Sequence, residues 1–423
     1  MRILHVVKTA DGAVWAAKLA TKLCALGVDL HVALPRAEGS AFLFWKNSGA
    51  TIHICDLDLP VRQPMRWPQV LRDARQLISR VSPDLIHSHF VGTTLVLRHA
   101  LGKKHPIPRV FQVPGPLHLE HSLFRRLELS LAGESDHWIG SSRCIVEHYL
   151  RSRVSLDRVF LSYYGDNLPS SNELPVENSL RARVGTRPGG FLVGSVSWMY
   201  PPKLYLGQLI GLKAHEDLID ALGTVCLMDP RVRGVIAGGA WGGATWYESR
   251  LRARARERAG DRIHFTGALP FAEAKQAWHA LDLAVHVPIS ENCGGVIEPL
   301  LAGVPVIASH VGGLPEVIYD GLTGTLIPLR HPGQLAESIL HNISRMDEMR
   351  KMASRGQSLV RQMFDVDRTA REVHAIYRHI LNGEARPAEF DSLAILQKLL
   401  AAESTVVNVN AGRPESQIRK EIA

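Results

Sequence analysis

SENCGGVIEPLLAGVPVIAS, residues 290–309, combines features that a core element and a surface loop do not share. It opens polar, passes two glycines, carries a glutamate in an apolar helix-like run and closes on a Val/Ile-rich strand. The preceding run LAVHVPI predicts a strand that ends near Ile289. Gly303 followed by Pro305 is typical of a helix end. The stretch therefore predicts strand, turn, helix and strand, the repeating unit of a parallel α/β sheet.

The turn in this stretch is suited to an anionic ligand. Gly294 and Gly295 are predicted to start the helix, where bare amides and the helix dipole favour negative charge. Helical side chains lean toward the N-terminus, so the Glu298 carboxylate would point back over the glycines. A phosphate at the amides and a sugar hydroxyl at the carboxylate would fit together, although an acid in the first turn is also a common capping residue.

The same alternation of strands and helices extends over most of the chain. Apolar strands joined by helices predict parallel sheets covered on both faces, the doubly wound α/β arrangement. A polar Ser, Asn and Pro-rich segment at residues 167–179 predicts a linker that extends through GTRPGG, residues 185–190. We expect Rossmann-like domains at residues 1–178 and 189–365, which face each other across a cleft. Residues 366–382 are predicted as a helix that returns to the first domain, and 383–423 as a mobile or loosely docked tail with one short amphipathic piece, SLAILQKLLA, at residues 392–401.

The composition is that of a globular chain without a membrane span. The 423 residues are 46% hydrophobic and 21% charged, and no apolar run is long enough to cross a bilayer. The start MRILHVV predicts a first strand and not a signal peptide. The five cysteines are scattered, which favours neither disulfides nor zinc and fits a reducing cytosol. We therefore expect a cytoplasmic protein.

The formal charge of +8 suits anionic partners such as nucleotide diphosphates, lipid phosphates or a membrane surface. Singly, the basic residues are typical of solvated helix faces; as a group they would allow peripheral contact with the inner face of a membrane. No nucleic-acid-binding motif accompanies them. Those in the first half are Arg62, Arg66, Arg72, Arg75, Arg80, Lys103, Lys104, Arg125 and Arg126.

Several blocks of the sequence resemble those of family 4 (GT4) retaining glycosyltransferases, which have the GT-B fold. The longest is ENCGGVIEPLLAGVPVIASHVGGLPEVIYDGLTGTLIP, at residues 291–328. The others, in the order of the family, are PDLIHSHF (83–90), DHWIGSS (136–142), YYGDN (163–167), GLKAHEDLIDAL (211–222), IAGGAW (236–241), DRIHFTG (261–267) and HVGGLPEVI (310–318). The resemblance spans roughly residues 1–381. It implies transfer of a sugar from a nucleotide diphosphate sugar, without a metal or other cofactor.

The resemblance also implies which residues hold the donor. Lys213 matches a lysine that, with the amides of Gly294 and Gly295, holds the diphosphate. Glu298 matches the second acid of the E-x7-E motif, which binds the nucleotide ribose. Glu291 would be the first acid, near the transferred sugar. Only six residues separate the two acids here, so an ungapped match places Ser290 at the first position.

Two further positions depart from the family pattern. Trp198 stands where the family often has a phosphate-binding arginine, and Lys203 is a candidate to replace it. The glycines of IAGGAWGG do not form a dinucleotide fingerprint; the resemblance implies that Gly238 and Gly239 line the nucleotide pocket.

On the acceptor side, the family often has a histidine directly after a strand of the first domain. Here His118 follows the strand RVFQV a few residues later, and it is our candidate to face the sugar as a neutral imidazole. His87, His89 and His121 are competitors. Gly12, in the loop after the first strand, would face the cleft. The DLD sequence at residues 56–58 follows a strand and is interpreted as a turn, so no metal site is predicted.

The favoured function is therefore a retaining glycosyltransferase, acting on a glycan or lipid-linked acceptor in bacterial-type polysaccharide or glycolipid assembly. Two alternatives stay open from the sequence. One is a nucleotide-sugar epimerase of the same fold. The other is a non-catalytic protein that binds a glycan or nucleotide, which the missing arginine and the shortened acid spacing would suit.

Overall fold

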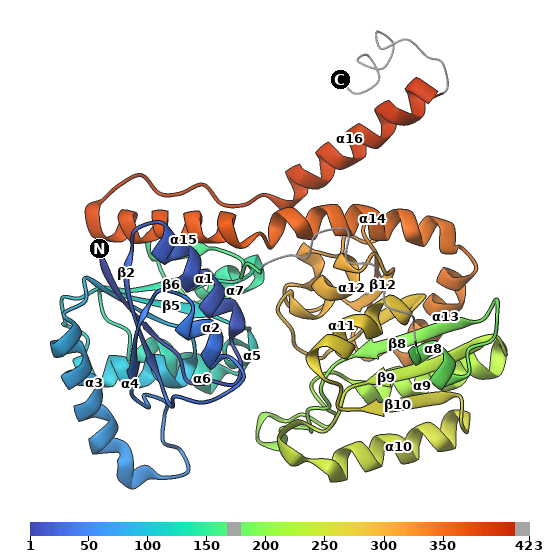
Figure 1. Ribbon diagram of the computed structural model, residues 1–423, viewed down its shortest axis with the longest axis horizontal. Coiled ribbons are helices and arrows are strands. Elements are labelled where there is room, and N and C mark those ends of the chain that lie inside the picture. The colour runs from blue at the N-terminus through green and yellow to red at the C-terminus, as the bar shows by residue number, and fades with distance from the viewer. Residues whose placement is uncertain (167–178, 411–423) are drawn as a thin grey trace.

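The computed structural model describes residues 1–166 and 179–410, so the first part of the predicted linker, residues 167–178, lies outside the described residues, whereas its end, residues 185–190, lies within them. Within them the chain forms two sheets in which every strand pair is parallel, each flanked by helices (Figure 1). This confirms the predicted pair of doubly wound α/β domains.

The first domain holds a seven-stranded sheet in the order β3-β2-β1-β4-β5-β6-β7. β4 and β5 are buried along their whole length, as expected of strands covered on both faces. The strand order reverses beside β1, so the loops after β1 and β4 diverge and leave room for a ligand. The elements are β1 (Arg2–Val6), α1 (Val14–Ala25), β2 (Asp29–Leu34), α2 (Phe42–Lys46), β3 (Thr51–Ile54), η1 (Pro64–Arg66), α3 (Trp67–Val81), β4 (Leu85–Ser88), α4 (Val91–Leu101), β5 (Arg109–Val113), α5 (Leu117–Glu120), α6 (Ser122–Ser130), β6 (Asp136–Gly140), α7 (Arg143–Arg151), η2 (Leu156–Arg158) and β7 (Val159–Leu161).

The second domain holds a six-stranded sheet in the order β10-β9-β8-β11-β12-β13. Its first helix, α8, already belongs to it: Leu180 is buried and Arg181 pairs with Asp282 at 2.7 Å. The second domain thus begins before the predicted boundary at residue 189. Its elements are α8 (Ser179–Val184), β8 (Phe191–Val196), η3 (Leu204–Leu206), α9 (His215–Met228), β9 (Val232–Ala237), η4 (Trp241–Gly243), α10 (Thr245–Ala259), β10 (Ile263–Gly267), α11 (Phe271–Ala280), β11 (Leu283–His286), η5 (Gly294–Val296), α12 (Ile297–Leu301), β12 (Val306–Ser309), η6 (Leu314–Glu316), β13 (Thr325–Ile327), α13 (Pro332–Ile343) and α14 (Met346–Met363).

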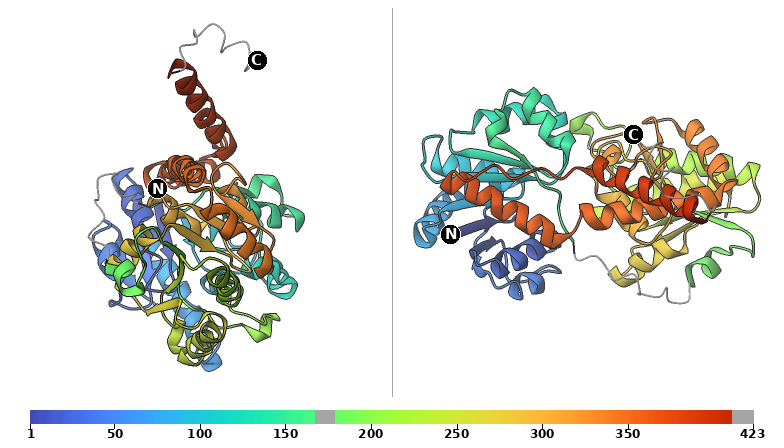
Figure 2. Two further views of the ribbon diagram at one scale, coloured as in Figure 1. Left: turned by 90° about the vertical axis from the view of Figure 1, so that its right-hand side faces the viewer. Right: turned by 90° about the horizontal axis from the view of Figure 1, so that it is seen from above.

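The chain then returns to the first domain through α15 (Val366–Asn382), which packs against α1 (Figures 1 and 2). The Tyr377 hydroxyl lies 3.0 Å from Nε2 of His5 on β1 and also hydrogen-bonds with Nδ1 of His87 on β4. Where the chain crosses, the Asp166 amide donates to the Phe364 carbonyl at 2.8 Å. The two domains are therefore joined at this point by two adjacent stretches of chain.

The first part of the tail is docked on the two domains, which is one of the two states expected of residues 383–423. Arg386 donates to the carbonyls of Leu156 (2.7 Å) and Val159 (2.6 Å) in the first domain. A further helix, α16 (Ser392–Asn410), starts against the second domain, where Leu396 is buried, and then projects from the body (Figure 2). These contacts were missed because their partners lie far away in sequence. Residues 411–423 lie outside the described part of the chain.

A carboxylate of the second domain caps a helix of the first. Glu316, in η6, accepts hydrogen bonds from the backbone amides of Arg143 (2.8 Å) and Cys144 (2.9 Å) at the start of α7. It also accepts from the Tyr163 hydroxyl at 2.7 Å. Free amides at a helix start need such a partner, so this contact fixes one domain against the other.

Candidate functional site

A cavity of about 610 Å³ lies between the two domains, at the carboxyl ends of their strands. Ligands of doubly wound sheets bind at this edge. Four of the predicted site residues, His118, Lys203, Lys213 and Glu291, lie in its wall. The first domain contributes Phe90, Val91, Pro114, Gly115, Pro116, Leu117, His118 and Phe124; the second contributes Tyr200, Lys203, Tyr205, Leu206, Leu212, Lys213, Ser290, Glu291 and Asn292.

Glu291 and Lys213 form an ion pair on the second-domain side of the cavity. Lys213 stands just before α9, and Glu291 stands in the turn after β11. His286, the last residue of β11, lies 3.1 Å from the same carboxylate oxygen through Nε2. Burial by itself would raise the pKa of Glu291, but the charges of Lys213 and His286 outweigh it and lower the pKa to about 2. Glu291 is therefore ionised at neutral pH, and it neutralises Lys213.

The glycines of the turn serve packing as well as access. Gly294 is exposed, and a side chain there would meet open space. A Cβ at position 295 would instead collide with the His286 ring. Gly295 is therefore required for packing, whereas Gly294 is not. That the amides of both glycines hold a phosphate stays a prediction. The predicted helix is also shorter than expected, with the 3-10 turn η5 leading into the five-residue α12.

Glu298 does not line the cavity. It is exposed on α12, and its Oε2 accepts a hydrogen bond from Trp278 Nε1 at 3.1 Å. The indole on α11 therefore holds the carboxylate in place. Its role toward a ribose stays a prediction.

His118 faces the cavity from α5 of the first domain. Burial lowers the pKa of its imidazole to about 4, so the ring is neutral at physiological pH. Its Nε2 atom is buried and has no hydrogen-bond partner among the described residues. A buried polar atom without a partner is costly, and among the first-domain residues of the cavity wall His118 is the one that carries such an atom. His87 and His89, two of its competitors, are fully buried beside His5 and do not line the cavity.

Lys203 lines the cavity as predicted, and burial lowers the pKa of its ammonium, with the charge of Lys8 adding to the effect. Trp198, at the family's arginine position, is turned toward Trp241 instead, with ring centroids 5.8 Å apart. The insertion after β8 thus brings the Lys203 ammonium to the cavity wall. That Lys203 replaces the family's arginine stays a prediction.

The remaining predicted glycines lie outside the cavity wall. Gly238 has a φ of 137°, and a Cβ there would strike the Ser197 carbonyl. A Cβ on Gly239 would press on the Ala268 amide at 2.9 Å. Both glycines thus allow the loops after β8, β9 and β10 to pack together. Gly12 lies in the loop between β1 and α1, where a side chain would meet nothing within 4 Å.

The sequence reasoning missed Asn292 as a site residue. Its Nδ2 donates to Ser141 Oγ of the first domain at 2.9 Å, so the turn that carries Glu291 is tied across the cleft. Nothing in the local pattern signals this contact, because its two partners are 151 positions apart.

Comparisons with known proteins agree with this arrangement. A family model described as "Glycosyl transferases group 1" matches residues 201–359, and one described as "Glycosyl transferase 4-like domain" matches residues 12–165. The chain is 26% identical over 323 residues to D-inositol 3-phosphate glycosyltransferase of Streptomyces bingchenggensis, which covers 72% of this chain and 68% of that relative.

Two solved structures share the fold. Alr3699/HepE of Anabaena, in complex with UDP and glucose, has a TM-score of 0.71 at 20% identity, covering 88% of this chain and 98% of that one. A putative UDP-N-acetylglucosamine 2-epimerase of Listeria monocytogenes has a TM-score of 0.61 at 15% identity, covering 92% and 99%. A protein with bound UDP and glucose and a putative epimerase thus share the fold, whereas both family models describe glycosyl transferases.

Proposed function

The chain belongs to the family 4 glycosyltransferases of the GT-B fold, and we propose that it transfers a sugar from a nucleoside diphosphate to an acceptor hydroxyl with retention of configuration. The observation that carries the proposal is the paired Lys213 and Glu291 facing His118 across the cavity between the domains. We place the reaction in polysaccharide or glycolipid assembly, at the cytoplasmic face of a membrane.

In the proposed reaction, the bond between the anomeric carbon and the diphosphate breaks, and a bond to the acceptor oxygen forms on the same face of the sugar. The proton of the acceptor hydroxyl passes to the leaving phosphate oxygen. The side chain of Lys213 would release Glu291 and neutralise the diphosphate, with Lys203 as a second cation. With two ammonium groups at the cavity, we propose that no metal ion is needed. Glu291 and the neutral His118 would then orient the sugar.

The donor nucleotide can be tested directly. Because the solved structure of similar fold carries UDP, we expect UDP to raise the melting temperature more than GDP or ADP do. Lys213→Met should abolish the shift, whereas Lys351→Met, an exposed lysine on α14, should leave it unchanged. If none of the three nucleotides stabilises the wild-type protein, the donor-site assignment fails.

The two alternatives predict different products. An epimerase would convert a nucleotide sugar into its free 2-epimer with no acceptor present. A binding protein would stabilise with a nucleotide yet turn over no donor. We expect neither; slow hydrolysis of the nucleotide sugar, lost in Lys213→Met, would instead support a transferase.

The surface at the cavity mouth favours an acceptor with an apolar part. Leu123 is 64% exposed on α6, and Leu204 and Tyr205 are 75% and 72% exposed across the cleft. Tyr205 itself lines the cavity.

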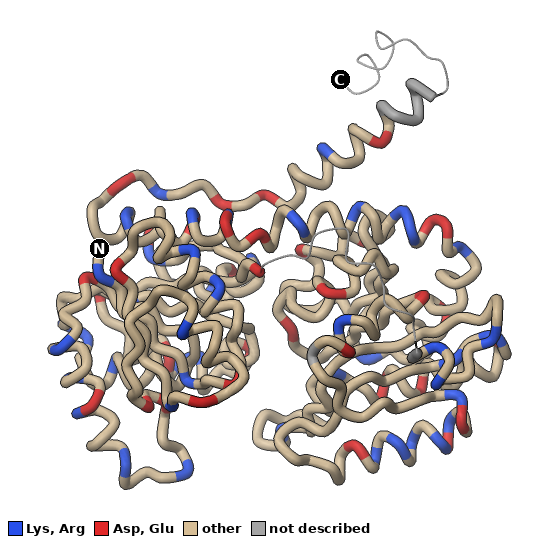
Figure 3. Tube along the Cα trace, in the orientation of Figure 1, with Lys and Arg blue, Asp and Glu red and all other residues tan. Residues whose placement is uncertain are grey.

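The basic residues do not mark one face for a membrane contact, because Lys and Arg residues lie on both domains, including α10 (Figure 3). The exposed apolar side chains therefore locate the proposed membrane contact better than the basic helices do. In residues 1–166 and 179–410 no helix has the length and apolar character needed to span a bilayer.

The membrane proposal is tested by flotation with vesicles of an anionic phospholipid. We expect the wild-type protein to float and Leu123→Ser combined with Leu204→Ser to float less, at unchanged melting temperature. Equal flotation of both proteins would contradict a contact at the cavity mouth.

A further inference from the structure

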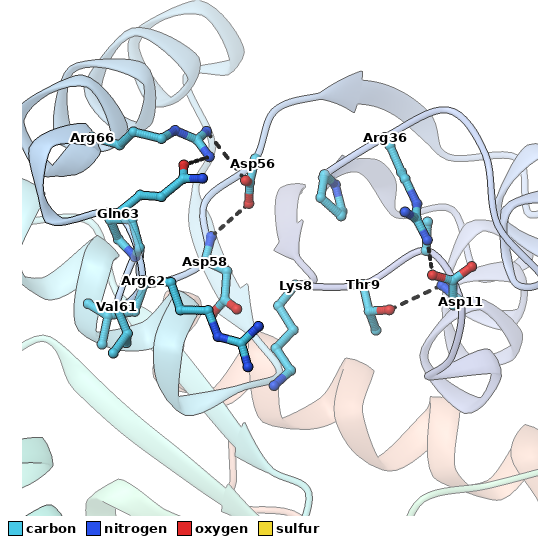
Figure 4. A pocket seen from close by; sticks show the side chains of 14 residues that line it. Lys8, Thr9, Asp11, Arg36, Asp56, Asp58, Val61, Arg62, Gln63 and Arg66 are labelled. Atoms are coloured by element: carbon cyan, nitrogen blue, oxygen red, sulfur yellow. Dashed lines mark hydrogen bonds and ion pairs between the residues drawn. The ribbon is translucent and has the colours of Figure 1, made fainter. Parts of the chain in front are cut away.

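A second cavity, of about 600 Å³, lies in the first domain at the carboxyl ends of β1, β2 and β3 (Figure 4). Lys8 follows β1, Arg36 follows β2, and Asp56 and Asp58 follow β3. Arg62, in the loop that leads to η1, forms a further wall. This is the ligand-binding edge of the sheet, and none of these residues lines the cleft cavity.

Two ion pairs account for four of the seven charged residues around this cavity. Arg36 pairs with Asp11, and Arg66 lies 3.5 Å from Asp56. These pairs lie on opposite sides of the opening in Figure 4. They hold the two loops but leave the centre to other residues.

Lys8 and Arg62 form no ion pair or hydrogen bond with the part of the chain that the structure describes. Figure 4 shows both side chains extending into the same space, beside Asp58. Burial raises the pKa of Asp58, and the Lys8 charge opposes that effect. The Thr9 hydroxyl accepts from the Asp11 amide at 3.1 Å, so its proton remains available to a ligand. Lys8 and Arg62 thus share one space with a single carboxylate, that of Asp58, and the positive charge left over is suited to bind an anion.

Lys8 lies between this cavity and the cleft. Its Nζ stands 5.1 Å from the centre of the Phe90 ring, and Phe90 is part of the cleft wall. Its charge also reaches Lys203 on the far side of the cleft. A molecule held at Lys8 would therefore extend toward the place where the donor sugar is expected.

We propose that Lys8, Arg62 and Thr9 bind a phosphate group of the acceptor, with the acceptor hydroxyl reaching into the cleft. The inference rests on the proposed transferase function and adds the chemical class of its acceptor, a phosphate ester. A planar guanidinium matches two phosphate oxygens, and the lysine adds a second charge.

Inorganic phosphate is the first probe, applied with UDP at saturation so that the donor site is filled. We expect phosphate to raise the melting temperature of the wild-type protein further. Lys8→Met combined with Arg62→Gln should lose this increment while keeping the UDP increment. Arg72→Gln, on the exposed face of α3, is the matched control and should keep both. If the double variant responds to phosphate like the wild type, the phosphate site is refuted.

A second pair of assays separates a soluble acceptor from a lipid headgroup. A panel of sugar phosphates and the same sugars without phosphate is offered with the donor, and flotation is measured with vesicles containing a phosphorylated lipid or neutral lipid alone. Selective loss of transfer to sugar phosphates in the double variant indicates a soluble ester, and selective loss of flotation indicates a lipid. A variant that matches the wild type in both assays overturns the proposal. If UDP raises the melting temperature of none of these proteins, the donor-site assignment is refuted instead.

Discussion

At the scale of single residues, the pair of Lys213 and Glu291 explains how a donor site can stay ordered without its ligand. Both side chains are about five-sixths buried, at 16% and 15% exposure. A buried lysine or carboxylate needs a partner, and each supplies the other's. A diphosphate that pairs with Lys213 would release Glu291 to contact the sugar. Donor binding would therefore be coupled to the release of the Glu291 carboxylate.

We expect Glu291→Gln to leave a buried, unpaired ammonium and to lower the free energy of unfolding by on the order of 3 kcal/mol, measured by urea denaturation. The diphosphate then meets no competitor for Lys213, so UDP binding should be kept or strengthened while sugar transfer falls. Glu298→Gln, at an exposed acid, is the stability control. Loss of UDP binding in Glu291→Gln would contradict this role.

The neutral imidazole of His118 leads to a second prediction. The pKa of His118 is lowered to about 4 by burial, so its neutral form persists as the pH falls from 8 to about 5. We therefore expect that protonation of His118 causes no fall in kcat/KM with a midpoint near pH 6.5. His118→Phe should lower kcat/KM by on the order of a hundredfold.

The control for this prediction is His121→Gln, one turn further on and outside the cavity wall. It should change kcat/KM little. A wild-type acid limb near pH 6.5 that disappears in His118→Phe would show that the ring titrates during turnover and would contradict the assignment.

At the scale of elements, three histidines tie the crossing helix to the first sheet. His5 on β1, His87 on β4 and His89 after it are fully buried, and Tyr377 of α15 bonds two of them. His89 Nε2 lies 3.1 Å from His5 Nδ1, which completes a chain of hydrogen bonds. Burial lowers the pKa of all three, that of His5 to about 3. The docking of α15 therefore requires neutral histidines.

This requirement predicts the acid stability. The folded protein keeps these rings neutral, whereas in the unfolded chain they bind protons below pH 6.5. Stability should be full above about pH 6.5 and fall as the pH drops from there toward 3, by up to about 1.4 kcal/mol per pH unit for each such histidine. Urea unfolding at pH 7.5, 6.5 and 5.5 measures the slope.

His5→Gln should reduce the dependence of the unfolding free energy on pH by the contribution of one histidine. This holds whether or not the substitution also changes the stability at pH 7.5. A slope that is flat between pH 6.5 and 5.5 in the wild-type protein would show that the cluster opens to solvent in the folded state.

At the scale of the whole molecule, Glu316 links the domains on the side where the chain crosses. It caps α7 from the other domain and lies in HVGGLPEVI, one of the blocks that resemble the family. We expect Glu316→Ala to cost about 1–2 kcal/mol, since it removes a charged cap from two amides. It should also loosen the domains, seen as an increased radius of gyration in small-angle scattering without UDP.

The comparison variant is Glu348→Ala, on the exposed first turn of α14, which contacts no amide of the other domain. Unchanged stability and radius in Glu316→Ala would show that the domains are held by the two crossing segments alone.

The sequence by itself determined the two parallel sheets, the cleft between them and four of the residues in its wall, namely His118, Lys203, Lys213 and Glu291. These features follow from the hydrophobic periodicity, the positions of glycine and proline, and short sequence blocks. Each of these signals acts within a single helix, strand or turn, so it can be recognised without knowing the tertiary structure. The tertiary structure alone decided that Gly295 makes room for His286, that Trp278 holds Glu298, that Asn292 and Glu316 join the domains, and that Lys8 and Arg62 share a cavity. Each of these contacts depends on how distant segments pack, because a side chain's partner is set by the space left between elements and not by its neighbours in sequence.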